Sequence, residues 1–429
     1  MLAYLIPTDF AGSVVRRIPV GRPAGKPMKD HARRLSSGQL ELGLPGDSHV
    51  APRRASIADF RTARRRICQW AAITMLFVAG SANAMFVQYR VIDMGSLSGL
   101  GATPLSVNEF GHATGVSAVG VNSANAFLYS GGTMADLGYP APFSRSVGNS
   151  INDHGQVAGT AANHQGDVTR GVLFDGSTMI VLGTLGGAKS QARGLNNLGQ
   201  VTGSAQLVDG TSHAYVYDAG TMHDIGALHG HTSIGYDIND GGQVVGVFLV
   251  GGNGQGGFFY DGTQMRDISS LGARSASAIN ESGAITGQTY GNVAYLLAGD
   301  TLTPLGTLGG SSSAGLDVND AGMVVGESYL PGDAESRGFL YYDGTMWDLA
   351  NLLDPTSSAG WFVQKAYSIN DHGQIVGTGL FGGQVRAILL DPVDAVQVPI
   401  PGTATLAVTG VLMVMAMRSS GGRRRTRLS

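Results

Sequence analysis

Residues 368–377 read SINDHGQIVG, and six similar ten-residue stretches occur elsewhere in the chain. Every copy has Asn at its third position and Gly at its sixth and tenth positions. The seven asparagines are Asn108, Asn152, Asn196, Asn239, Asn280, Asn319 and Asn370. They span 262 residues in six intervals, about 44 residues per repeat, which is the period of four-stranded propeller blades.

The third copy shows how one repeat should fold. Leu195 and Asn196 end one short strand, and Asn-Asn-Leu-Gly turns into the next strand at 200–205, because Asn tolerates left-handed backbone angles and Gly adopts them freely. Aromatic and β-branched runs at 213–218 and 221–225 supply two more strands. Because no segment between them has the length or period of an amphipathic helix, we expect an all-β domain.

The two ends of the array are complementary. The seventh repeat stops near Pro392 after its third strand, whereas residues 89–99 match the fourth-strand segments of other repeats. Met94 precedes Asn108 by 14 residues, the interval found at the same place in other repeats. Pairing these fragments would remove two exposed sheet edges. The sequence therefore predicts a seven-bladed β-propeller closed by an N-terminal strand, rather than an open solenoid with polar capping repeats.

Charge is segregated along the chain. Residues 85–397, the propeller repeat domain, contain 10 Lys and Arg against 26 Asp and Glu side chains. The first 84 residues contain 13 basic and 5 acidic side chains. The negative charge of the propeller domain argues against nucleic acid as a partner.

Residues 61–84 have the three parts of a secretory signal. Three arginines precede an apolar run over 67–78, and small residues end at Ala84. We expect cleavage after Ala84, which would also remove Cys68, the only cysteine. Residues 1–60 show no strand pattern and indicate a start codon assigned too far upstream. The segment predicts export to the cell surface or the extracellular space.

Residues 398–429 form a second three-part segment. A short Pro-containing motif precedes an apolar run over 403–417, and five arginines follow. The motif residues are Val398, Pro399 and Pro401. The segment resembles the PEP-CTERM sorting signal of Gram-negative bacteria, with Ile400 where that signal usually has Glu. The resemblance implies a transmembrane helix, transient membrane anchoring and processing by an exosortase-like enzyme. A simple tail anchor, held by its positive flank, is the alternative.

Short phrases recur beside the Asn-centred hairpins. They include Ala-Phe-Leu-Tyr at 126–129, Asp-Gly-Thr-Met at 343–346 and Leu-Gly-Thr-Leu-Gly-Gly at 182–187. In these short motifs, residues 89–390 resemble the HAF-repeat family of extracellular bacterial proteins. The resemblance implies the repeat type and an extracellular location. It transfers no active-site residues, because the function of that family is uncharacterised.

The sequence offers no catalytic, cofactor or metal residues that we would assign. The Asn-Asp-x-Gly turns lack the alternating oxygen ligands that a calcium loop needs over about twelve residues. The densest imidazole group consists of His223, His229 and His231 with Asp224. Two of these histidines lie in a Gly-rich connector without a second ligand pair at metal-site spacing, so we interpret them as solvated loop residues. Nucleophile and metalloprotease motifs are missing.

Two functions remain open. The first is a non-catalytic surface or matrix protein whose loops, including Trp347 and Trp361, bind an exopolysaccharide or another surface protein. The second is a propeller-type carbohydrate-active enzyme, a hydrolase or lyase with carboxylates in the central channel. It would need a pair of carboxylates about 5 to 9 Å apart. We favour binding, although catalytic groups gathered from several blades would leave no local sequence motif.

Overall fold

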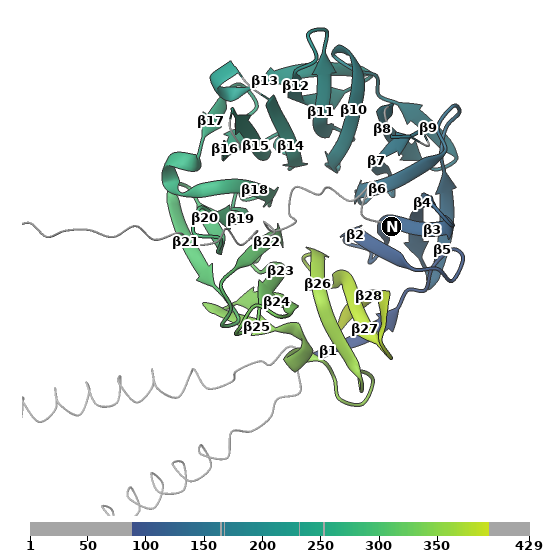
Figure 1. Ribbon diagram of the computed structural model, residues 1–429, viewed down its shortest axis with the longest axis vertical. Helices are drawn as coiled ribbons and strands as arrows, with labels where there is room; N and C mark the ends of the chain where they lie inside the picture. The colour runs from purple at the N-terminus through teal and green to yellow at the C-terminus, as the bar shows by residue number, and fades with distance from the viewer. Residues whose placement is uncertain (1–87, 164, 167, 231, 252–253, 394–429) are drawn as a thin grey trace, which may run out of the picture. The chain divides into compact units, whose positions relative to one another are not determined.

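The computed structural model describes residues 88–163, 165–166, 168–230, 232–251 and 254–393. These residues form seven four-stranded antiparallel sheets arranged in a ring (Figure 1). The prediction of a seven-bladed β-propeller is therefore confirmed. Within the described residues, no helix is long and apolar enough to cross a membrane.

In blades 1 to 6 the strands run from the innermost to the outermost position in chain order, whereas the outermost strand of blade 7 is β1 (Figure 1). Blade 1 consists of β2 (Ala102–Val107), β3 (Ala113–Gly120), β4 (Ser123–Ser130) and β5 (Thr133–Gly138). Blade 2 consists of β6 (Arg145–Ile151), β7 (Val157–Ala162), β8 (Thr169–Asp175) and β9 (Thr178–Val181). Blade 3 consists of β10 (Gly186–Leu195), β11 (Val201–Leu207), β12 (Ser212–Asp218) and β13 (Thr221–Gly226). Blade 4 consists of β14 (Thr232–Ile238), β15 (Val244–Val250), β16 (Gly254–Tyr260) and β17 (Met265–Asp267).

Blade 5 consists of β18 (Ala273–Ile279), β19 (Ile285–Thr289), β20 (Ala294–Ala298) and β21 (Thr301–Gly306). Blade 6 consists of β22 (Ser313–Val318), β23 (Val324–Tyr329), β24 (Ser336–Tyr342) and β25 (Thr345–Asp348). Blade 7 consists of β26 (Trp361–Ile369), β27 (Ile375–Phe381), β28 (Gln384–Val393) and β1 (Gln88–Asp93). Short 3-10 helices precede blades 4, 5 and 7: η3 (Leu228–Gly230), η4 (Ser269–Leu271) and η5 (Leu349–Leu352).

Strand β1 closes the ring from the other end of the array. It pairs antiparallel with β28 over its whole length, as the complementary ends of the sequence predicted. Tyr89 of β1 is 1% exposed and belongs to the hydrophobic core of blade 7. An ion pair of 2.7 Å joins Arg386 of β28 to Asp93 of β1. The outer edge of β28 is therefore covered by residues almost three hundred positions away in the chain.

Both glycines of the repeated motif are required by geometry. The first has a positive φ of 72° to 81° in all seven copies, a left-handed conformation that favours Gly in the turn. The last approaches the carbonyl group of the inner strand. A Cβ at Gly115 would lie 2.1 Å from the oxygen of Thr103, and the other six copies leave no more than 2.2 Å. The motif therefore encodes both a tight turn and a close strand pair.

The hydrophobic core lies mainly between neighbouring blades. The third strand of each blade contributes a side chain with no exposed area, and these are Phe127, Val172, Tyr215, Phe258, Tyr295, Phe339 and Ile388. Phe127 of blade 1, for example, packs with Val376 and Leu389 of blade 7. One blade cannot bury its apolar faces alone, so stability depends on a complete ring.

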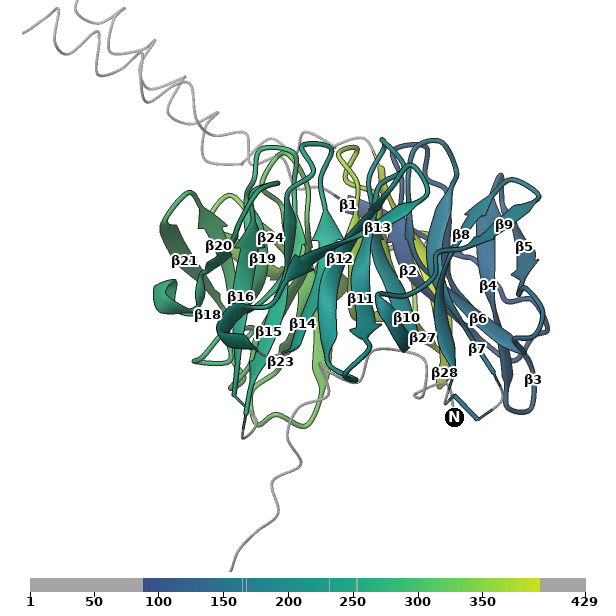
Figure 2. The same cartoon turned by 90° about the horizontal axis from the view of Figure 1, so that it is seen from above.

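Alternating strand directions give the ring two faces (Figure 2). The seven motif turns, between the first and second strands, lie on one face, which we call the turn face. Gln88 and Val393, which pair in the seam, also lie at this face. The turns between second and third strands and the connections between blades lie on the other face, the connector face. The two faces carry the two candidate sites described next.

Candidate functional site

The seven motif asparagines form a closed ring of hydrogen bonds at the turn face. Each Nδ2 donates to the backbone carbonyl of the motif Asn in the next blade, at 2.9 to 3.1 Å. The last of these bonds, from Asn370 to Asn108, joins blade 7 to blade 1. All seven side chains are 3 to 6% exposed. The amides therefore connect every blade to its neighbour.

The same side chains also hold their own turns. In every copy Oδ1 accepts the backbone N–H four residues later. In Asn196, for example, both oxygen lone pairs and both amide hydrogens are used, because Nδ2 also donates to Oε1 of Gln200. From the sequence, we interpreted these asparagines as turn residues only. Their role between blades was missed, because it depends on residues about 44 positions apart.

A second ring follows the first by one residue. Its side chains are Glu109, Asp153, Asn197, Asp240, Glu281, Asp320 and Asp371. Each accepts the backbone N–H of the equivalent residue in the preceding blade, at 2.7 to 3.0 Å. With four of the motif asparagines, Asn108, Asn196, Asn280 and Asn319, they line a cavity of about 260 Å³ in which polar lining predominates. We call these six carboxylates and one amide the acidic ring.

Two further carboxylates, Asp237 and Asp317, accept backbone N–H groups where the repeat lacks a side-chain acceptor. Two residues before the motif Asn, Ser106 and Ser368 accept an N–H from the following blade. Blades 3 and 5 have Gly194 and Ala278 there, which offer no acceptor. In the blade that follows, an Asp supplies two oxygens: Asp237 accepts the N–H groups of Ile238 and Ile279, and Asp317 those of Val318 and Ile369.

Burial of these carboxylates raises the pKa of Asp237 to about 7, with the charge of Asp317 as the second cause. The pKa of Asp317 is also raised, mainly by burial. Asp237 keeps some accessible area, but protein atoms surround it closely.

The hydrogen bonds of the turn face thus join each blade to its neighbour. Each member of the acidic ring is held along the circumference by a backbone N–H, because it serves as an acceptor for the neighbouring blade. Within the part of the chain that the structure describes, no three His, Cys, Asp or Glu side chains are grouped to hold a metal ion. The repeated chemistry of this face accounts for its carboxylates as structural acceptors.

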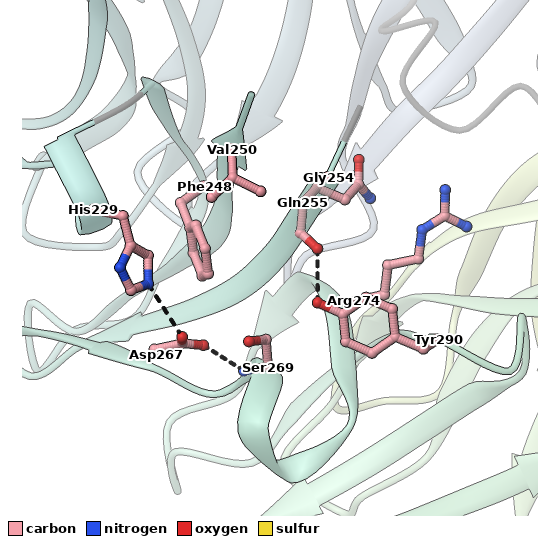
Figure 3. Close-up of a pocket in the computed structure, with 9 residues that line it drawn as sticks. All are labelled: His229, Phe248, Val250, Gly254, Gln255, Asp267, Ser269, Arg274 and Tyr290. Atoms are coloured by element: carbon pink, nitrogen blue, oxygen red, sulfur yellow. Dashed lines mark hydrogen bonds and ion pairs between the residues drawn. The ribbon is translucent and has the colours of Figure 1, made fainter. Parts of the chain in front are cut away.

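The connector face contains a pocket of about 490 Å³ between blades 4 and 5 (Figure 3). Its lining comes from η3, β15, β16, β17, η4, β18 and the residue after β19. The lining residues are His229, Phe248, Val250, Gly254, Gln255, Asp267, Ser269, Arg274 and Tyr290. We call it the interblade pocket. It combines aromatic, amide, hydroxyl and charged groups in one concavity.

One side of the pocket is formed by an imidazole, a phenyl ring and a carboxylate (Figure 3). His229 has a left-handed φ of 59°, which places its ring 5.3 Å from that of Phe248. Its Nε2 lies 3.5 Å from Oδ2 of Asp267, whose other oxygen accepts the N–H of Ser269. A Cβ at Gly256 would lie 2.5 Å from the ring of Phe248, so this glycine makes room for the aromatic wall.

The other side is formed by Gln255, Arg274 and Tyr290 (Figure 3). Tyr290 donates its hydroxyl to the backbone carbonyl of Gln255 at 2.8 Å, a bond that crosses from blade 5 to blade 4. Its side chain remains 55% exposed. Arg274 lies at a register shift between Ala273 and Ser275, and this bulge turns it toward the pocket.

Position in the repeat distinguishes the pocket from the acidic ring. Phe248 stands nine residues after its motif Asn. The six equivalent residues are all small: Ser117, Ala161, Ala205, Thr289, Ser328 and Gly379. Six residues before the motif Asn, Arg274 stands where blades 2, 3, 4 and 6 have Ser. The pocket therefore arises from departures from the repeat, a signal that alignment of the seven copies would have revealed.

Several residues singled out from the sequence lie elsewhere than expected. Trp347 is in β25 and Trp361 begins β26, where it stacks on Phe381 at 4.9 Å; neither tryptophan lines the interblade pocket. Asp224 pairs with His213, while His229 pairs with Asp267, so the structure divides the imidazole group. His229 is indeed an exposed loop residue, but the expectation of a purely solvated role is incomplete because it lines the pocket.

The targeting residues lie outside the described part of the chain. These are Ala84 of the signal segment and Val398, Pro399 and Pro401 of the sorting motif. The cleavage and sorting predictions therefore stay predictions. His231 of the imidazole group also lies outside the described residues.

Sequence comparison identifies one matching family. A family described as "Protein of unknown function (DUF3466)" matches residues 208–385, which include all of the interblade pocket. No curated protein matches the chain. The matched segment covers less than half of the 429 residues.

Solved structures with similar folds share little sequence. TolB from Acinetobacter baumannii is 14% identical, with a TM-score of 0.39, and the match covers 67% of this chain and 65% of TolB. A puromycin-hydrolyzing peptidase from Mycobacterium tuberculosis is 13% identical, with a TM-score of 0.43 and coverage of 67% and 53%. YCF48 bound to D1 peptide is 15% identical, with a TM-score of 0.44 and coverage of 73% and 97%.

The chain thus spans less than two thirds of TolB and about half of the peptidase. All three TM-scores lie below 0.5, so these similarities carry no argument about function. The chain is a seven-bladed β-propeller in which residues 208–385 match a family of unknown function.

Proposed function

We propose that this chain is an exported, non-catalytic binding protein of the bacterial surface or matrix, and that its interblade pocket takes a sugar unit of an exopolysaccharide. The observation that carries the proposal is that Phe248 and Arg274, which depart from the repeat, meet in this pocket. A structural ring needs only its repeated residues. Departures that meet in one concavity therefore favour a ligand site.

The pocket has the chemistry that a sugar requires. Tyr290 is 55% exposed and offers an aromatic face on which the apolar side of a pyranose ring can lie. Asp267 and Ser269 offer acceptor and hydroxyl groups for sugar hydroxyls, and Asp267 is 33% exposed. The volume of about 490 Å³ falls in the range of small-molecule sites, roughly 300 to 1,000 Å³.

The extracellular part of the proposal rests on the sequence. The basic, apolar and small-residue order before Ala84 supports export, and the resemblance of 398–429 to a sorting signal supports processing by an exosortase-like enzyme. N-terminal sequencing and mass spectrometry of the exported protein test both points. We expect a new N-terminus at Met85 and a C-terminus near Pro401; a species ending at Ser429 would instead support a tail anchor.

A glycan array probed with the full-length chain tests the binding function. We expect a defined set of oligosaccharides to bind, and Tyr290→Ala to weaken binding at least tenfold because a stacking surface is lost. Tyr329→Ala is the matched control, since Tyr329 occupies the same repeat position in the next blade and lies outside the pocket. Absence of binding to any glycan by the folded protein would contradict the proposal.

The alternative is a carbohydrate-active enzyme that uses the channel carboxylates. Its one supporting observation is the pair Asp237 and Asp317, whose pKa values are both raised. Both oxygens of each side chain already accept backbone N–H groups, which leaves them poorly placed for proton transfer. Cleavage of bound oligosaccharides by the native chain but not by Asp237→Asn would favour the enzyme.

A further inference from the structure

Arg274 is the one arginine among the residues that line the interblade pocket. Residues 85–397 contain 10 basic and 26 acidic side chains. Among the described residues, ion pairs with Asp or Glu hold five of these ten basic side chains: Arg90, Arg266, Arg337, Lys365 and Arg386. Arg274 has no carboxylate within ion-pair distance among the described residues. Its positive charge therefore has no direct counter-charge there, although carboxylates are abundant.

Neutral groups hold this guanidinium in place. Nη1 donates to Oδ1 of Asn292 at 3.1 Å and, at 3.4 Å, to Oε1 of Gln288. Both acceptors are amide oxygens, which orient the side chain without neutralising it. The remaining N–H groups of Arg274 are left for a ligand. The guanidinium lies on the same side of the pocket as the amide of Gln255 and the ring of Tyr290 (Figure 3).

The pocket's own carboxylate lies on the opposite side. Asp267 is 3.5 Å from His229 and accepts the N–H of Ser269, so it is engaged with its neighbours. The pocket consequently has a basic side with an aromatic ring and an acidic side with a hydroxyl. A ligand that matches both sides carries a carboxylate at one end and hydroxyl groups at the other.

We infer that the interblade pocket takes a hexuronate unit of an acidic polysaccharide, with the sugar carboxylate bound by Arg274. This inference rests on the proposed function and names the class of glycan. A guanidinium matches a carboxylate by two parallel N–H donors, which gives both strength and orientation. The sugar ring then lies over Tyr290, and its hydroxyl groups reach Asp267 and Ser269.

The carboxylate contact should dominate selectivity. Charge-assisted hydrogen bonds in a partly enclosed site correspond to an affinity difference of about tenfold to a hundredfold. The propeller domain, residues 85–397, is acidic and repels polyanions in general, so its binding of an acidic glycan has to come from a local site such as this one. Added salt should weaken binding to the acid form more than binding to a neutral form.

Isothermal titration of the full-length chain with matched oligosaccharides tests the inference. The ligands are short oligomers of galacturonate, glucuronate and mannuronate, each compared with its methyl ester, which neutralises the carboxylate and adds one methyl group. We expect at least one acid to bind ten times or more tighter than its ester. Arg274→Gln should abolish that difference, and Arg274→Lys should retain only part of it.

Arg266→Gln is the control for net charge. Arg266 is an exposed arginine, ion-paired with Asp300 and outside the pocket, so its loss should preserve the preference for the acid. Equal loss in both variants would overturn the inference in favour of a general charge effect. Equal binding of acids and esters would overturn it while leaving the proposed glycan binding intact. Failure of every sugar to bind the folded chain would remove both.

Discussion

The acidic ring and the interblade pocket both contain carboxylates, but the ring joins neighbouring blades whereas the pocket is the candidate ligand site. At the turn face, seven equivalent positions repeat the same hydrogen bonds from blade to blade. At the connector face, the pocket between blades 4 and 5 includes Phe248 and Arg274, which the equivalent positions of other blades lack. Carboxylates in the first region accept backbone N–H groups, whereas Arg274 in the second keeps an uncompensated charge. In a repeat protein, departures from the repeat are the better guide to a ligand site.

Removing β1 should have the largest effect on the stability of the ring. Deleting residues 89–97 exposes the edge of β28 and removes the buried Tyr89, so we expect loss of cooperative unfolding and aggregation. Thermal unfolding followed by circular dichroism and size-exclusion chromatography measure both. Adding a peptide of residues 88–97 in trans should restore part of the stability. An unchanged melting temperature would show that the ring does not depend on this closure.

The next largest effect is expected in the pH dependence of the free energy of unfolding. Asp237 releases its proton near pH 3.8 when unfolded but only near pH 7 when folded. Between these values the folded state binds more protons, so the free energy of unfolding should fall as pH rises from 4 to 7. The fall should not exceed about 4 kcal/mol, since one pKa unit corresponds to about 1.4 kcal/mol. Asp317 acts in the same direction.

Chemical denaturation at several pH values checks this expectation. Asp237→Asn removes the charge with little change of shape and should flatten the dependence between pH 4 and 7. Asp261→Asn is a suitable control, because hydrogen bonds from Thr263 and Gln264 lower the pKa of Asp261 to about 2, outside this range. An undiminished slope in Asp237→Asn would show that other groups control it.

Breaking one link of the asparagine ring comes third. Asn196→Ala removes four hydrogen bonds from a side chain that is 4% exposed. We expect destabilisation by about 3 kcal/mol, because buried backbone groups lose their partners. Urea denaturation measures it. Leu198→Ala, in the same turn but 68% exposed, should change stability by less than about 0.5 kcal/mol. Similar losses in both variants would refute a special role for the ring.

The smallest effect is expected in the pocket. Tyr290→Phe removes only the hydroxyl bond to Gln255 between blades 5 and 4, so stability should fall by about 1 kcal/mol or less. Ligand affinity should fall a few-fold, because the aromatic wall loses an anchor. Tyr260→Phe loses a comparable bond, to Gly262, outside the pocket and should leave affinity unchanged. A stability loss as large as that of Asn196→Ala would make the pocket wall part of the structural frame.

Some features of the molecule were accessible from sequence because they are local and repeated. The spacing of the asparagines predicted seven blades, and the fragments near Tyr89 and Pro392 predicted the closure. The carboxylates of the acidic ring could also be read as repeat positions. Their bonding partners could not, because each partner belongs to the next blade. Trp347 and Trp361 were expected in binding loops, yet the structure places them in β25 and β26, outside the interblade pocket.

The sequence alone determined the number of blades, the turns and the need for closure, since alternating apolar strands and Asn-Gly turns act over a few residues and repeat with a fixed period. Tertiary structure alone decided which side chains meet across blades. It brought Phe248 and Arg274 to one pocket from opposite sides of a blade boundary, and it joined Asn370 to Asn108. The physical reason is that neither contact contributes to the local preference of its own segment. Each forms only when the ring brings neighbouring blades together.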